Sequence, residues 1–179
     1  ETGMRAIVCI DSTRLGPAKG GVRMRPDVTE DEVFRLARAM TLKTAMAGLP
    51  FGGGKSGIIA DPKQMSSEQK AALVKAYGKA IKNLAPSEYV SAPDMNMAEE
   101  EMRLIVEASG SDKTVTGKPS DMGGLPHELG STGFGVYHST LVALEHLGLD
   151  VKKITFAVEG FGNVGQFAAK FLCKDGAKL

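Results

Sequence analysis

The sequence predicts an α/β fold, because short runs of apolar and β-branched residues alternate with segments that have helical periodicity. Three features carry this prediction: an apolar run at residues 6–10, a helix-capping pattern that begins at Thr29, and a strand, glycine-rich turn and helix over residues 154–176. The chain has 179 residues, which is enough for one sizeable core or for one domain and part of another.

The amino-terminal part is expected to alternate between strands and helices. Three short apolar runs predict strands: residues 6–10, 57–60 and 88–90. Helices are expected to begin at three polar residues that are each followed, three positions later, by Glu or Gln: Thr29, Ser66 and Asn96. Residues 110–130 are rich in Gly, Pro, Ser and Asp and lack periodicity, which predicts a long loop. We therefore divide the chain into domains of residues 1–130 and 131–179.

The carboxy-terminal part carries the pattern of a dinucleotide-binding turn. A helix is expected over residues 131–147, a strand over 154–158, and a second helix that ends at Gly176. Between that strand and that helix stands Gly160-Phe161-Gly162-Asn163-Val164-Gly165, the glycine fingerprint in its required setting. In such a unit the first glycine makes the tight turn, the second admits a pyrophosphate, and the third lets helix and strand pack closely. A packing turn without a ligand is the alternative interpretation.

The fingerprint lacks its acidic ribose-binding residue. That residue stands ~20 positions beyond the glycines, at the end of the next strand, whereas the sequence given ends at Leu179. We therefore expect a fragment that contains only the beginning of a Rossmann-type dinucleotide-binding domain. This polypeptide alone is expected to bind nicotinamide dinucleotides poorly.

The composition narrows the class of protein. The formal net charge of +1 argues against a nucleic-acid partner bound by bulk electrostatics, and the apolar runs are far shorter than the ~20 residues of a membrane helix. Cys9 and Cys173 stand far apart and outside any metal-binding spacing, so neither a disulfide framework nor a metal site is expected. A cytoplasmic protein is the expectation, and the first four residues read as an interior segment.

The segment at residues 49–58, LPFGGGKSGI, looks at first like a phosphate-binding P-loop. That motif needs a glycine where this chain has Leu49, and Pro50 removes an amide that the loop would use. What remains is Lys55 between glycines, where a small ligand could approach the backbone closely. The alternative is an exposed lysine on a glycine turn.

Several segments stand in the order and spacing of one family: Gly16-Pro17-Ala18-Lys19-Gly20-Gly21-Val22-Arg23, Thr41-Leu42-Lys43, residues 49–57, Ala92-Pro93-Asp94-Met95-Asn96, Gly123-Gly124 with Thr132, and Gly160 through Gly165. Together they resemble the glutamate, leucine, phenylalanine and valine dehydrogenases over nearly the whole chain. The resemblance implies an amino-terminal substrate-binding and catalytic domain, a carboxy-terminal dinucleotide-binding domain and a reaction in the cleft between them. It also implies a homo-oligomer, commonly a hexamer.

The reaction implied by the resemblance is the reversible, NAD- or NADP-dependent oxidative deamination of an L-amino acid. A hydride passes from the amino acid Cα to nicotinamide, and water attacks the resulting iminium, so protons must move near neutral pH. The resemblance makes Lys55 the residue that activates water and Asp94 the proton shuttle for the amino group. Burial and a second lysine nearby would lower the pKa of Lys55 toward the working range. Asp94 could instead be a turn residue or a helix cap.

Substrate recognition is implied for two further lysines. Lys43 would bind the substrate α-carboxylate, or else be an ordinary cation at a helix end. Lys19 would pair with a side-chain carboxylate, which favours glutamate, or else be a surface lysine. The resemblance extends to three glycines at the substrate and to the cofactor contacts: Gly20, Gly21 and Gly53 for the substrate, and Thr132, Gly160, Phe161, Gly162, Asn163, Val164 and Gly165 for NAD or NADP.

Some positions depart from the pattern of the glutamate enzymes. Met97 stands where threonine is frequent, residues 125–128 read Leu-Pro-His-Glu where serine and then arginine are more usual, and residues 133–137 resemble the leucine enzymes. Glutamate is our expected substrate, with a branched-chain or aromatic amino-acid dehydrogenase as the alternative. A non-catalytic regulatory or assembly module with a truncated cofactor domain is a second alternative, against which the intact set of Lys43, Lys55 and Asp94 argues.

Overall fold

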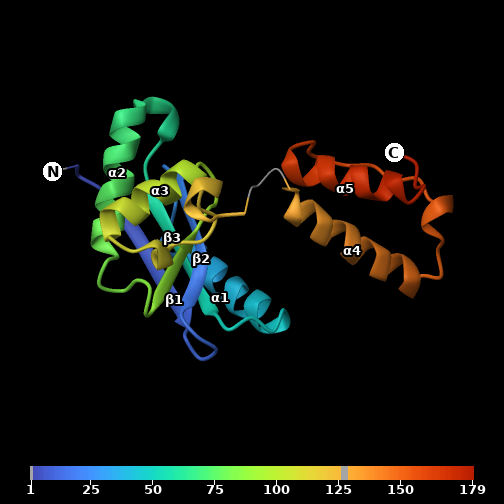
Figure 1. Ribbon diagram of the computed structural model, residues 1–179, viewed down its shortest axis with the longest axis horizontal. Coiled ribbons are helices and arrows are strands. Elements are labelled where there is room, and N and C mark those ends of the chain that lie inside the picture. The colour runs from blue at the N-terminus through green and yellow to red at the C-terminus, as the bar shows by residue number, and fades with distance from the viewer. Residues whose placement is uncertain (1, 126–128) are drawn as a thin grey trace. The chain divides into compact units, whose positions relative to one another are not determined.

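The computed structural model describes residues 2–125 and 129–179. The chain forms two compact units, with the division between residues 125 and 126, and each unit is described by itself (Figure 1). Both contain helices, and the first holds a four-stranded sheet. The predicted α/β class is confirmed. None of the described helices is both long and apolar enough to cross a membrane.

The sheet of the first unit has the strand order β1-β3-β2-β4. Its strands are β1 (Ala6–Ser12), β2 (Ala18–Arg25), β3 (Gly52–Ile59) and β4 (Tyr89–Ala92). The edge strand β1 runs antiparallel to β3, whereas β2 is parallel to both β3 and β4. The two central strands, β2 and β3, therefore carry side chains toward both layers of helices.

Three helices cover the sheet: α1 (Glu30–Met46), α2 (Ser67–Ala80) and α3 (Glu99–Ser109). In Figure 1, α2 and α3 lie on one side of the sheet and α1 lies on the other. The main core lies on the α2 and α3 side and includes Val22, Met24 and Ile58 from the strands, Tyr77 from α2 and Met102 from α3. Because side chains alternate along a strand, the remaining positions of β2 and β3 face α1.

The predicted starts of α1 and α2 are confirmed. The Thr29 hydroxyl accepts a hydrogen bond from the Glu32 amide, and Ser66 and Gln69 bond each other's backbone reciprocally. The prediction that Asn96 opens α3 is wrong. That helix begins at Glu99, and the Glu101 carboxylate accepts a hydrogen bond from the Ala98 amide at 2.7 Å.

The structure reveals one strand that was not predicted and lengthens another. β2 contains Gly20 and Gly21 and charged residues, so its sequence lacks the usual β-branched character of a strand. β3 begins at Gly52 rather than at residue 57, so the glycine run is part of a central strand and not a turn. A Cβ at Gly53 would lie 2.1 Å from the Thr41 amide nitrogen, which explains why this strand uses glycine where α1 packs onto it.

The second unit is a helical pair with one short β contact. Its helices are α4 (Ser131–His146) and α5 (Asn163–Lys174), as expected. The predicted strand at residues 154–158 is not formed: its only pairing among the described residues is a parallel bridge between Thr155 and Lys178. A strand needs a neighbour along its length, and here the neighbouring segment is residues 177–179.

Short 3₁₀ turns complete the described elements. They are η1 (Pro62–Gln64), η2 (Asp112–Thr114), η3 (Ser120–Met122) and η5 (Val151–Lys153). Two of these, η2 and η3, lie in the stretch predicted as a long loop, so that loop is partly ordered into turns. Of residues 125–128, which depart from the pattern of the glutamate enzymes, residues 126–128 lie outside the described part of the chain.

Candidate active site

The face of the sheet toward α1 carries a row of cations from β2 and β3. The parallel register places Lys19 beside Gly53 and Arg23 beside Gly57. Lys55 lies between these two glycines on β3 and points to the same face, because side chains two positions apart share a face. The strands thus bring Lys19, Arg23 and Lys55 together on one surface.

Lys55 is buried and paired with a carboxylate. The residue is only 7% exposed, and its Nζ contacts Oδ2 of Asp94. The alternative of an exposed lysine on a glycine turn is therefore wrong, because Lys55 lies in the central strand β3. The contact joins two residues that are far apart in sequence, since Asp94 follows the opposite edge strand, β4.

Asp94 is held by charge and by its backbone neighbour. Its Oδ2 accepts hydrogen bonds from Nε and from Nη2 of Arg23, both at 3.2 Å, and its Oδ1 accepts one from the Met95 amide at 2.8 Å. Burial alone would raise the pKa of Asp94, but Lys55, the Met95 amide and Arg23 together outweigh burial and hold that pKa below its ordinary value. Asp94 is therefore an anion at neutral pH in this structure.

The turn after β4 fixes the position of Asp94. The backbones of Asp94 and Met97 bond each other, at 3.2 Å and 3.0 Å. Asn96 takes the left-handed conformation, with φ of 61°, and its side-chain amide donates to the Met24 carbonyl at 2.9 Å. Asn96 thus ties the turn to β2 instead of capping a helix, a role consistent with the tolerance of asparagine for positive φ.

Lys19 is a partly buried cation with a neutral partner. Its Nζ donates to Oγ1 of Thr116 at 2.5 Å and lies 5.8 Å from the centre of the Phe51 ring. Within the described part of the chain, no ion pair involves Lys19. Burial lowers the pKa of Lys19 because it disfavours the ammonium form, and a carboxylate ligand would offset that cost. Thr116 and Phe51 were not anticipated, because only the fold brings them to Lys19.

The other predicted substrate residues lie at different places. Lys43 is exposed in the last turn of α1, and no described contact joins it to the pair of Lys55 and Asp94. Gly20 and Gly21 lie in β2, where a Cβ at Gly20 would meet the Gly54 carbonyl oxygen at 1.6 Å and one at Gly21 would meet Cβ of Asp94 at 2.8 Å. These glycines let the strands and the Asp94 turn approach closely.

We expect Gly53→Ala to lower the stability of the first unit by about 1–3 kcal/mol, because the added methyl would overlap the backbone of α1. Gly135→Ala is the matched control, since nothing lies within 4 Å of its Cβ position in α4 and alanine favours a helix interior by up to about 1 kcal/mol. Urea unfolding followed by amide signals of each unit measures both effects. Equal effects of the two substitutions would contradict the close approach of α1 to β3.

The predicted cofactor residues all lie in the second unit. Gly160 has φ of 84°, which favours glycine, and a Cβ at Gly165 would lie 2.1 Å from the Gly160 carbonyl oxygen. Nothing lies within 4 Å of the Cβ position of Gly162, which directly precedes α5. Phe161 and Thr132 are exposed. The turn therefore leaves its backbone open at the amino end of a helix, where an anionic group can bind.

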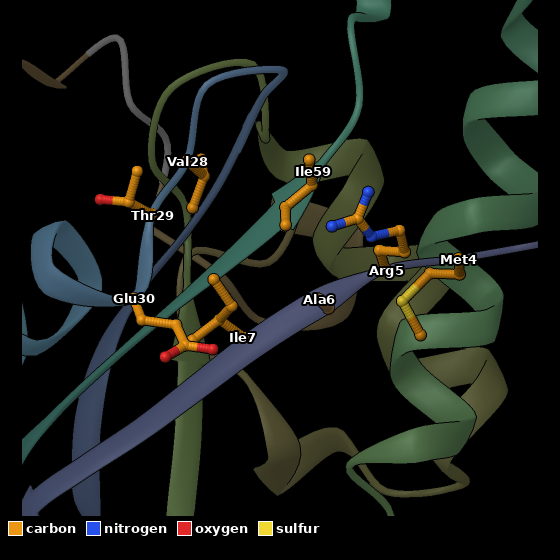
Figure 2. A pocket seen from close by; sticks show the side chains of 8 residues that line it. All are labelled: Met4, Arg5, Ala6, Ile7, Val28, Thr29, Glu30 and Ile59. Atoms are coloured by element: carbon orange, nitrogen blue, oxygen red, sulfur yellow. The ribbon is translucent and has the colours of Figure 1, made fainter.

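A cavity of the first unit lies apart from the pair of Lys55 and Asp94. It has a volume of about 530 Å³ and opens beside the starts of β1 and α1 (Figure 2). It is lined by Met4, Arg5, Ala6, Ile7, Val28, Thr29, Glu30 and Ile59. None of the predicted site residues lines it. The convergence of ionisable groups around Asp94, and not this hollow, marks the candidate active site.

Sequence reasoning missed Arg23 and Glu32 as neighbours of Asp94. Arg23 was noticed only as part of a family segment, yet it bonds Asp94 directly and also donates to Oε1 of Glu32 at 2.5 Å. The signal was available in the alternation of Lys19, Gly21 and Arg23, which share a face once residues 18–25 are read as a strand.

The fold and this cluster define a mixed α/β protein in which a buried lysine contacts a partly buried aspartate, a pair suited to proton transfer. Residues 1–110 match the family described as Glu/Leu/Phe/Val dehydrogenase, dimerisation domain, and residues 123–179 match the family described as Glutamate/Leucine/Phenylalanine/Valine dehydrogenase. The chain therefore belongs to the glutamate, leucine, phenylalanine and valine dehydrogenase family, as the resemblance of its motifs indicated.

Individual relatives agree with this membership. The chain is 42% identical over 172 residues to glutamate dehydrogenase of Thermotoga maritima, covering 92% of this chain and 41% of the relative. It is 40% identical to the NAD-specific glutamate dehydrogenase of Staphylococcus aureus, covering 92% and 42%. Hetero-hexameric glutamate dehydrogenase from Thermus thermophilus, solved in a Leu-bound form, matches with a TM-score of 0.82 and 30% identity, covering 97% of this chain and 48% of that chain. The chain spans about two fifths of the length of these curated relatives.

Proposed function

We propose that the full-length protein carrying this sequence is an NAD- or NADP-dependent amino-acid dehydrogenase that interconverts L-glutamate with 2-oxoglutarate and ammonia. The observation that supports this most directly is the buried contact between Lys55 and Asp94, on the same face of the sheet as Lys19. An acid–base pair and a cation without an ionic partner among the described residues suit an amino acid with a second carboxylate.

In the proposed reaction, Lys55 and Asp94 divide the proton transfers. The substrate loses a hydride from Cα, water adds to the resulting iminium carbon, and ammonia leaves. Lys55 first passes its ammonium proton to the Asp94 carboxylate; the neutral amine of Lys55 then takes a proton from the attacking water, and Asp94 gives its proton to the departing nitrogen. Because Nζ of Lys55 contacts Oδ2 of Asp94, a proton can pass directly between the two groups. Ionic pairing holds both side chains in position before the substrate arrives.

Substrate binding is proposed to use two lysines and three glycines of β2 and β3. Lys19 would bind the side-chain carboxylate and Lys43 the α-carboxylate, each as a point charge. Gly20, Gly21 and Gly53 are proposed as backbone contacts of the substrate: Gly21 and Gly53 lie on the face of Lys19 and Lys55, whereas Gly20 lies on the opposite face of β2. We assign substrate binding and catalysis to residues 1–130 and cofactor binding to residues 131–179.

The residues of the glycine turn fit a nicotinamide dinucleotide. Gly160, Phe161, Gly162, Asn163, Val164 and Gly165 would hold its pyrophosphate at the amino end of α5, and Thr132 at the start of α4 would be a further contact. The fit rests on the open backbone at Gly162 and on the positive φ of Gly160. When bound, NAD or NADP supplies the hydride acceptor.

We further propose a cytoplasmic homo-oligomer, with a hexamer as the expected state. The name of the matched amino-terminal family includes a dimerisation domain, and the Thermus relative is described as a hetero-hexamer. A near-neutral formal charge of +1 gives no support to a nucleic-acid partner.

The proposal is tested by incubating the full-length protein with L-glutamate and either NAD or NADP. We expect the reduced nicotinamide to accumulate together with ammonia, and we expect Asp94→Asn to lower the rate by about 10²–10⁴-fold, because it removes a positioned proton carrier. Activity with leucine or phenylalanine but not with glutamate would favour the branched-chain or aromatic alternative. No amino-acid-dependent reduction with either cofactor would favour the non-catalytic module.

A further inference from the structure

Asp94 shares its arginine with a second carboxylate. Arg23 contacts Oδ2 of Asp94 through Nε and Nη2 at 3.2 Å, while its Nη1 donates to Oε1 of Glu32 at 2.5 Å. The Arg23 side chain is 13% exposed, Asp94 17% and Glu32 26%, so water screens these contacts only in part. The guanidinium thus bridges the proposed proton shuttle and Glu32 of α1.

The fold fixes this bridge from two elements. Arg23 lies on β2, two positions beyond Gly21, and Glu32 lies in the first turn of α1. Arg25 donates to the same Glu32 oxygen at 3.3 Å and to Asp27 at 2.9 Å. Glu32 is therefore held between two arginines. Its negative charge partly offsets the effect of the positive charge of Arg23 on Asp94.

We propose that Arg23, with Glu32 as its counter-ion, sets how readily Asp94 takes up a proton. It thereby sets the pH at which kcat/KM begins to fall on the acidic side. Arg23 is here a positioning residue that acts through Asp94. The inference rests on the proposed function for its kinetic consequence, but its effect on the proton affinity of Asp94 does not depend on turnover.

Charges of opposite sign act on Asp94 from different elements. The charged groups that face Asp94 are Lys55 from β3 and Arg23 from β2, with Arg25 farther along β2 and Glu32 from α1 behind Arg23. The two direct cations favour the carboxylate form, which hinders proton uptake during turnover. The negative charge of Glu32 partly offsets the positive charge of Arg23, so the pKa of Asp94 is lowered less than it would be by Arg23 alone. Removing Arg23 and removing Glu32 should therefore move the pKa of Asp94 in opposite directions.

The test is an NMR titration of the 179-residue chain labelled with ¹³C at the aspartate carboxyl groups, with Asp94→Asn identifying the signal. In Arg23→Met we expect the pKa of Asp94 to rise by about one unit, within the range of effects of one adjacent cation. In Glu32→Gln we expect it to fall by a smaller amount. Arg35→Met and Asp31→Asn are matched controls, because they form an exposed ion pair on α1, and neither should move the Asp94 signal.

Opposite shifts support the inference, whereas no shift in Arg23→Met, or a rise in both variants, overturns it. If circular dichroism shows that Arg23→Met does not fold, the titration of Glu32→Gln decides alone: a fall in the pKa of Asp94 supports the inference, and no fall overturns it. In the full-length protein, the acidic limb of the kcat/KM profile should follow the NMR shifts. If the NMR shifts occur without a change in that limb, Arg23 tunes Asp94 as inferred, but Asp94 is not the proton carrier of the proposed function.

Discussion

Replacing Lys55 with alanine in the full-length protein is expected to lower kcat by about 10²–10⁴-fold, the usual contribution of a positioned acid or base. The affinity for NAD or NADP should stay nearly unchanged, because Lys55 lies in β3 and the proposed cofactor residues lie in the second unit. Steady-state rates with glutamate and a separate cofactor titration measure the two quantities.

The same substitution has a structural cost that must be separated from the kinetic one. Removing Lys55 leaves Asp94 with one of its two cations, and because Asp94 is partly exposed and keeps Arg23, the cost should lie below the value of about 3–5 kcal/mol for breaking a fully buried ion pair from one side. The double variant Lys55→Ala, Asp94→Asn removes both charges and should recover part of the stability but none of the activity. Urea unfolding of the single and double variants shows which loss is due to folding.

Lys75→Ala is the matched control for Lys55. Lys75 pairs with Glu107 at 3.1 Å, but both side chains are nearly half exposed, so the pair contributes little to stability and lies outside the candidate site. Its rate should match that of the parent. If Lys55→Ala also keeps a rate within a few-fold of the parent, Lys55 does not activate water and the mechanism proposed for it is wrong.

The sequence predicted the elements whose signals are local. The helix starts at Thr29 and Ser66 were confirmed because a capping box is a contact within four residues. β2 and the first part of β3 escaped because their glycines are explained only by what packs on them, such as the Thr41 backbone over Gly53. Tertiary contact, which a local pattern does not contain, decided these segments.

The candidate site was predictable only in part for the same reason. The resemblance to a family assigned Lys55 and Asp94 to the same site. In the structure β2 lies between β3, which carries Lys55, and β4, which precedes Asp94, so their contact depends on the order of the strands in the sheet. No local pattern connects Arg23 with Glu32. The sequence therefore indicated which residue types were present, whereas the register of β2 and β3 determined which of them meet.

Lys19 shows how the structure sharpens a substrate prediction. Its ammonium has a hydroxyl and an aromatic ring as neighbours, and burial lowers its pKa. At neutral pH the folded protein therefore bears a cost for keeping the charge, and this cost disappears as pH rises from the lowered folded pKa through the unfolded pKa. Lys19→Leu should consequently leave the melting temperature unchanged or raise it, because it removes a poorly compensated cation. A residue that costs stability in the free protein fits a role in binding.

In the full-length protein, we expect Lys19→Leu to lower kcat/KM for glutamate by roughly tenfold to a thousandfold, because the side-chain carboxylate of the substrate then lacks its cation. Norvaline and leucine carry no such carboxylate, so their kcat/KM should be unchanged or higher. Thr116→Val is the matched control: it removes the hydroxyl partner of Lys19 but keeps the charge, so the preference for glutamate over norvaline should survive. Measuring kcat/KM for glutamate and norvaline in the three proteins decides the assignment. A parallel fall for both substrates in Lys19→Leu would mean that Lys19 supports the fold, and no change for either would remove the main support for glutamate as the substrate.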